Sequence, residues 1–75
     1  MYNNNAIYQE GGMQMTLAEE MIQYRARHKL SQTKFGELCG VNVMTINFIE
    51  REIQKPTALT KAKIRLVLDA EQEEK

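Results

Sequence analysis

The side chains best suited to chemistry lie between Gln32 and Lys55. Gln32 and Asn47 carry amides, which donate and accept hydrogen bonds at once and can pair bidentately with the edge of an adenine. Arg51 and Lys55 add cations that suit phosphate oxygens. The sequence offers no nucleophile–base pair, no cluster of metal ligands and no glycine-rich phosphate loop. These residue types indicate recognition by hydrogen bonds and charge, and we expect no catalytic residue, metal site or cofactor.

A chain of 75 residues is enough for one small domain. Its composition is that of a globular protein, with 43% hydrophobic and 27% charged residues. No apolar run approaches the length of a membrane span, and the N-terminus lacks the basic-then-apolar order of a signal peptide. The single cysteine, Cys39, excludes an internal disulfide and is typical of a reducing compartment. We therefore expect a soluble cytoplasmic protein that does not contact membranes, with Cys39 as a small core residue.

The charges are unevenly distributed, although the formal net charge is zero. Residues 16–68 hold nine basic and five acidic side chains, which gives this segment a net charge of +4. Residues 1–15 carry −1 and residues 69–75 carry −3. The acidic ends therefore mask a basic middle, and the neutral total does not exclude a polyanionic partner.

Apolar periodicity predicts an all-α domain over residues 15–70, and no segment alternates as a strand does. Residues 1–14 show no periodicity and are expected to form a flexible arm, and residues 71–75 are expected to form an acidic tail. We expect a small bundle of four to five helices with a helix-turn-helix at its centre. The four helices that the pattern predicts run over about residues 17–29, 32–39, 43–51 and 58–70.

Each predicted helix has a residue suited to its start. Thr16 and Glu19 match a capping box, and Ser31, Asn42 and Thr57 can cap the later helices. The side chains expected to face the core recur at helical spacing, with Ile64 and Val67 as alternatives in the last helix. The expected core consists of Leu17, Met21, Tyr24, Phe35, Leu38, Cys39, Val41, Ile46, Ile49, Leu59, Ala62 and Leu66.

The two central helices are short and are separated by three residues, which is the layout of a helix-turn-helix. Gly40 suits the left-handed conformation at the end of the first of them. Gly36 leaves room where the two helices cross, and Val41 fills the corner between them. Together with inward Phe35 and Ile46, this spacing predicts that the second helix is held at an angle from which it projects out of the domain.

The segment LSQTKFGELCGVNVMTINFIER resembles the helix-turn-helix domains of the Cro and phage-repressor class, also called Xre-like. The resemblance covers roughly residues 16–69. It implies a lambda-repressor-like fold and a sequence-specific transcriptional regulator, generally a repressor from a phage or mobile element. Such a protein binds double-stranded DNA in the cytoplasm, at the nucleoid, and usually acts as a homodimer. The matching residues are Arg25, Leu30-Ser31-Gln32, Gly40-Val41, Ile46, Ile49-Glu50-Arg51 and Lys55-Pro56-Thr57.

The resemblance also implies roles for individual residues. The helix over residues 43–51 is expected to lie in the major groove, while the helix before it crosses the DNA backbone. Gln32 is expected to bind a phosphate or a base edge, and Arg51 to reach a phosphate. Arg25 and Glu50 are expected to form a structural ion pair that does not touch DNA. The full set of expected DNA-binding residues is Gln32, Thr33, Asn42, Val43, Met44, Thr45, Asn47, Phe48, Arg51 and Lys55.

Three departures from the family pattern affect these expectations. Glu52 stands where the family often has glycine, so we expect the turn after the third helix to be made in another way. The sequence ends soon after the fourth predicted helix, whereas most members have a fifth that contributes to the core or the dimer surface. The groove-facing residues are mainly apolar, with Thr45 and Asn47 as the polar readers. This predicts modest sequence discrimination or a preference for sites that contain thymine.

A second function is consistent with the same residues. An exposed Phe48 beside Met44 would suit a protein partner. The alternative is therefore a protein-interaction module on the same fold, similar to an antitoxin or an anti-repressor. The apolar face and the neutral total charge favour this alternative, whereas the basic middle of the chain favours DNA. The two functions are compatible, because antitoxins of this fold also repress their own operons.

Overall fold

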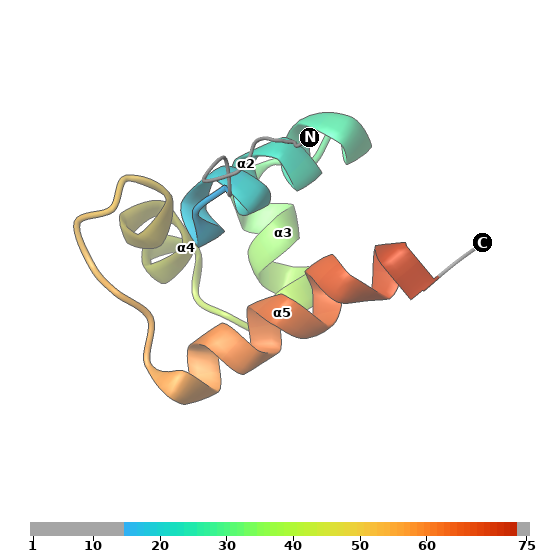
Figure 1. Cartoon of the computed structure of the whole chain (residues 1–75). Helices are drawn as coiled ribbons and strands as arrows, with labels where there is room; N and C mark the ends of the chain where they lie inside the picture. Colours follow the sequence, from blue (N-terminus) through green and yellow to red (C-terminus); the bar gives the residue numbers. More distant parts are fainter. Residues whose placement is uncertain (1–14, 74–75) are drawn as a thin grey trace, which may run out of the picture.

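The computed structural model describes residues 15–73, with side chains described as far as Ala70. Over this range the chain forms four helices and no strand, which confirms the all-α fold (Figure 1). The expected arm over residues 1–14 lies outside the described residues. The last helix continues to Glu73, beyond the predicted end at about Ala70. The helices are α2 (Leu17–His28), α3 (Gln32–Cys39), α4 (Val43–Glu50) and α5 (Ala58–Glu73).

The helix α3 lies at the centre of Figure 1, with α2 above it and α5 below it. It packs on α4 and on α5, and α2 packs on the same two helices. The helix α4 is therefore supported by α2 and α3, and one side of it is left open to solvent. Among the residues described, no helix is long and apolar enough to cross a membrane.

Side chains at the predicted positions cap the four helices. The Thr16 hydroxyl accepts a hydrogen bond from the Glu19 amide, and the Glu19 carboxylate accepts one from the Thr16 amide, at 3.1 and 3.0 Å. The Ser31 hydroxyl, the Asn42 amide oxygen and the Thr57 hydroxyl each accept a backbone N–H of the following helix. Each of these bonds satisfies a donor that the first turn of a helix leaves without a partner.

Three helix ends share one backbone arrangement. Lys29, Gly40 and Glu52 follow α2, α3 and α4 in the left-handed region, with φ of 56°, 73° and 61°. In each case the next residue donates its N–H to a carbonyl five residues back, at 2.9 Å, as in a Schellman motif. The expectation that the turn at Glu52 is made in another way is therefore wrong. Glutamate adopts the left-handed conformation here, where glycine would do so without strain.

The core is formed by side chains from all four helices, and it differs from the predicted core in α3 and α5. Leu38, Leu59 and Leu66 are 56%, 67% and 74% exposed, and Ala62 is also exposed. Helix α5 carries two apolar stripes, and the stripe that includes Ile64 faces inward because α2 and α3 approach that side. The fully or largely buried apolar side chains are Ala18, Met21, Phe35, Cys39, Ile46, Ile49, Ile64 and Leu68, with Leu17, Tyr24, Leu30, Val41 and Val67 packed against this cluster.

Cys39 occupies the predicted core position. Burial raises the pKa of its thiol to about 11, because the apolar surroundings disfavour the thiolate. The side chain is therefore protonated at neutral pH and packs as a small apolar group.

The crossing of α3 and α4 depends on the absence of a side chain at Gly36. A methyl group built at this position would lie 2.6 Å from the carbonyl oxygen of Val41 and 3.5 Å from the side chain of Ile46. Gly40 has no neighbour within 4 Å of such a group, but its φ of 73° disfavours other residues. The two glycines are thus required for different reasons, one for space and the other for backbone conformation.

Substitutions at the two glycines test this difference. Gly36→Ala is expected to lower the free energy of unfolding by about 1–3 kcal/mol, because the methyl group meets a backbone carbonyl. Gly40→Ala is expected to cost about 1–2 kcal/mol through backbone strain. Gly40→Asn should recover part of the second loss, since asparagine tolerates the left-handed region, whereas Gly36→Asn should recover nothing. Urea unfolding measures all four variants, and wild-type stability of Gly36→Ala would contradict the close approach.

Candidate nucleic-acid interface

The open side of α4 presents residues opposite its buried ones. Ile46, Ile49 and Glu50 face the core, so the residues one half-turn away point outward. Met44 is 59% exposed and Arg51 is exposed, while Asn47 and Phe48 are half-buried. We call Met44, Asn47, Phe48 and Arg51, together with Val43 at the start of the helix, the outer face of α4. It is largely apolar, as the sequence predicts, with polar groups at its C-terminal end.

Arg25 and Glu50, expected as a structural pair, form a bidentate salt bridge. Nε and Nη2 of Arg25 donate to the two carboxylate oxygens of Glu50, each at 2.8 Å. The Glu50 side chain is 4% exposed, and Arg25 also donates to the carbonyl of Leu30 at 3.1 Å. The hydrogen bond to Glu50 raises the pKa of Arg25 above its ordinary value. The pair joins the end of α2 to the end of α4, on the inner side of the helix that presents the outer face.

The Glu50 carboxylate also begins a series of hydrogen bonds that leads to the surface. Gln32 donates from Nε2 to Oε1 of Glu50 at 3.0 Å, and Asn47 donates from Nδ2 to Oε1 of Gln32 at 3.1 Å. Arg51 then donates to Oδ1 of Asn47 at 3.4 Å. A carboxylate only accepts hydrogen bonds, so it requires the NH₂ group of Gln32 to face it. This fixes which way both amides point.

The network changes the interpretation of two residues that sequence reasoning assigned to DNA. Gln32 and Asn47 are half-buried and already bonded to each other, although each amide retains a second N–H. The sequence predicts the ion pair, the two amides and Arg51 as separate features, whereas the structure connects them in one series. One available signal was the position of Gln32, which lies four and seven residues before the buried Gly36 and Cys39 and so on the inner side of α3.

The remaining expected DNA-binding residues lie around this network. Thr33 is exposed in the first turn of α3, and Thr45 is half-buried on the flank of α4. Asn42 is exposed, but its side-chain oxygen accepts the Met44 N–H at 2.7 Å and is thereby engaged as the cap of α4. Thr33 and Asn42 are thus at the starts of the two helices of the motif, where backbone N–H groups and the helix dipole favour an anion.

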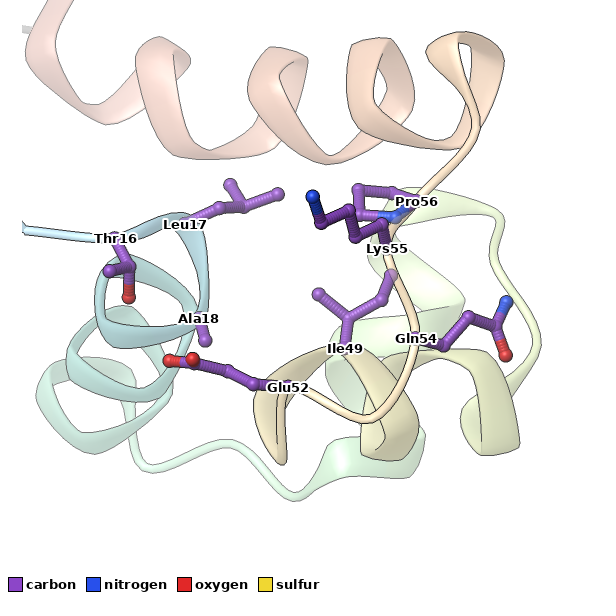
Figure 2. Close-up of a pocket in the computed structure, with 8 residues that line it drawn as sticks. All are labelled: Thr16, Leu17, Ala18, Ile49, Glu52, Gln54, Lys55 and Pro56. Atoms are coloured by element: carbon purple, nitrogen blue, oxygen red, sulfur yellow. The ribbon is translucent and has the colours of Figure 1, made fainter.

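Lys55 belongs to a different feature, an open hollow between the start of α2 and the loop that follows α4. Figure 2 shows its side chain extending over this hollow, opposite Leu17 and beside Pro56. Its lining is partly apolar, with Leu17, Ala18, Ile49 and Pro56, and partly polar, with Thr16, Glu52, Gln54 and Lys55. The structure therefore does not bring Lys55 into the hydrogen-bonded series that ends at Arg51. Within the described residues, no group of three or more acidic, histidine or cysteine side chains could hold a metal ion.

Replacing Glu50 tests the importance of the network. Glu50→Gln leaves the Arg25 charge without its partner and, in either orientation of the new amide, places an NH₂ group against an N–H of Arg25. We therefore expect it to lower the free energy of unfolding by about 3–5 kcal/mol. Glu37→Gln is the matched control, because Glu37 pairs with Lys34 on the surface and both side chains are more than half exposed. The control should change stability by less than about 1 kcal/mol. Similar small effects of both substitutions in urea unfolding would contradict a structural role for Glu50.

Comparison with known proteins agrees with this geometry. A family model described as Helix-turn-helix, HTH_3, matches residues 21–69, a span that includes α3, α4, the turn between them and most of α2 and α5. The searches of curated proteins and of solved structures found no match. The family model covers more than half of the chain. The chain belongs to the Xre/Cro-like helix-turn-helix family of DNA-binding regulators.

Proposed function

We propose that this protein is a sequence-specific transcriptional repressor that inserts α4 into the major groove of double-stranded DNA. The observation that carries the proposal is the outer face of α4, which is open to solvent while the inner side of the same helix is tied to α2 and α3 through Glu50. A major groove about 12 Å wide admits one α-helix. A helix held rigidly on one side and free on the other is suited to that groove.

Backbone contacts position the protein in this proposal. Arg51 lies at the C-terminal end of the outer face and supplies a cation for a phosphate. The start of α3, with Ser31 as its N-cap and Thr33 exposed, directs backbone N–H groups outward at the positive end of a helix dipole. Lys55 adds a second cation in the loop after α4. The basic segment of the chain, with its net charge of +4, adds long-range attraction to the polyanion.

Base recognition is assigned to the middle and start of α4. Val43 and Met44 are suited to contact thymine methyl groups, because they are apolar and exposed. Asn47 retains an N–H for a base edge, and Thr45 offers a hydroxyl on the flank of the helix. With few polar readers on this face, we expect modest discrimination and a preference for sites that contain thymine. Repression follows if the bound domain occupies DNA that the polymerase must reach.

A second candidate function is binding of a protein partner through the outer face of α4. Met44 is 59% exposed, and the nearby Phe48 is half-buried, so this face offers apolar area to a protein as well as to DNA. This function is that of an antitoxin-like or anti-repressor-like module. It is compatible with DNA binding only if the two partners use the face at different times.

Selection from a pool of random duplex DNA, repeated at two salt concentrations, separates the two functions. The proposed function predicts recovery of a short motif, with an affinity that falls steeply as salt increases. If the protein acts as a homodimer, the motif should be two-fold symmetric. Recovery of no sequence at low salt would reject DNA reading, and a pull-down with Met44→Ala as the control would then test the protein partner.

Two substitutions on the outer face test the assigned roles. Arg51→Ala is expected to weaken binding to all sequences and to reduce the dependence of log K on log salt by about one unit, because one phosphate contact is lost. Asn47→Ala is expected to change the preference among sites and to leave the salt dependence nearly unchanged. Both effects can be measured by fluorescence anisotropy over a salt series.

Arg51→Lys serves as the control for charge. It keeps the cation, so it should retain the salt dependence of the wild type even if some affinity is lost. Equal loss from Arg51→Ala and Asn47→Ala, with an unchanged salt dependence for both, would contradict the separate roles.

A further inference from the structure

The methionine side chains differ widely in their access to solvent. Among the methionines whose side chains the structure describes, Met44 is 59% exposed, Met15 is 45% exposed and Met21 is fully buried. Oxidation of a thioether requires contact with the oxidant, so susceptibility follows exposure. The core therefore protects Met21, whereas Met44 and Met15 are open to small oxidants.

Of the two exposed methionines, Met44 is the one that lies on the outer face of α4. It is in the first turn of this helix, where its backbone N–H donates to Oδ1 of Asn42 at 2.7 Å. Met15 precedes Thr16, the N-cap of α2, and is not part of the outer face. A chemical change at Met44 thus alters the surface that we propose to read DNA, and a change at Met15 does not.

The thiol of the chain does not compete for an oxidant. Cys39 is the single cysteine and is buried in the core. Burial raises the pKa of its thiol to about 11, so the thiolate, which is the form that reacts, is scarce at neutral pH. An oxidant that meets the folded domain therefore finds the exposed thioether of Met44 and not a reactive thiol.

We propose that Met44 is an oxidation site, and that conversion of its thioether to a sulfoxide by a peroxide releases the protein from DNA. The inference rests on the proposed function, in which Met44 contacts base edges. The sulfur attacks one peroxide oxygen, the O–O bond breaks, and the leaving hydroxide takes up a proton and becomes water. The sulfur loses the two electrons that the peroxide gains. The product is a polar side chain in place of an apolar one.

The sulfoxide opposes the contact proposed for Met44. In the major groove thymine presents a methyl group and an acceptor oxygen, so it offers no donor to the sulfoxide oxygen. That oxygen would lose its water on binding and gain no hydrogen bond from thymine in return. In the free protein the same side chain is 59% exposed, so the sulfoxide stays hydrated and the fold is not strained. Oxidation should therefore weaken DNA binding without unfolding the domain.

Treatment of the full chain with hydrogen peroxide tests the proposal. Peptide mass spectrometry should show Met44 converted while Met21 remains a thioether. Fluorescence anisotropy on a selected DNA site should then give a Kd on the order of tenfold higher than that of the untreated protein. Urea unfolding of the same sample should give the midpoint of the untreated protein. Methionine sulfoxide reductases that act on both sulfoxide epimers should restore the affinity.

Met44→Leu is the decisive variant, because leucine has no thioether. The chain has five methionines, so this variant keeps the other four. Whatever its affinity before treatment, peroxide should leave that affinity unchanged. Met15→Leu is the matched control, which should bind as the wild type does and should lose affinity after treatment as the wild type does.

Two results would overturn the proposal. One is equal loss of affinity in Met44→Leu and the wild type, which would place the sensitive group elsewhere. The other is unchanged binding by a sample in which Met44 is fully converted. If the untreated wild type binds no DNA sequence, the proposed function fails and the oxidation switch fails with it. If the untreated protein binds DNA and conversion of Met44 has no effect, the oxidation switch alone fails, so the two failures are distinguishable.

Discussion

The salt bridge between Arg25 and Glu50 is the interaction on which the rest of the domain depends. It is the point where α2 and α4 are joined by charge, and Glu50 accepts hydrogen bonds from both Arg25 and Gln32. A buried carboxylate is stable only when its lone pairs are satisfied, so these donors must stay in place. The inner side of α4 is thereby immobilised, while its outer face remains available. The same atoms thus serve the stability of the fold and the orientation of the helix that we propose to read DNA.

Local signals in the sequence were sufficient to predict the helices and their starts. Capping patterns act over two or three residues and do not depend on the rest of the fold. Examples are the pair Thr16 and Glu19, and Asn42. The turn at Glu52 was not predictable in this way. Its left-handed backbone is imposed by two hydrogen bonds at the end of α4, and glutamate has no intrinsic preference for it. Residue type indicates a conformation only where the residue itself favours it.

Tertiary packing, and not apolar periodicity, determines which side of α5 is buried. Helix α5 has one apolar stripe that includes Ile64 and another that includes Leu66, and both have helical spacing. Which stripe is buried depends on where α2 and α3 lie, and no pattern within α5 contains that information. The series from Glu50 through Gln32 to Asn47 was missed for the same reason. Gln32 is 15 and 18 residues away from Asn47 and Glu50 in the sequence, and it meets them only when α3 crosses α4.

The hydrogen-bonded series divides the outer face of α4 into two parts that differ in how freely they can evolve. Val43 and Met44 form no side-chain bond in the network, so substitutions there should combine nearly additively with changes elsewhere. Asn47 is bonded to both Gln32 and Arg51, so any replacement also disturbs its neighbours and, through Gln32, the buried carboxylate. New site preferences would therefore arise most readily by mutation at the first turn of α4. Changes at Asn47 would require a compensating change at Gln32, and the two positions should vary together among relatives.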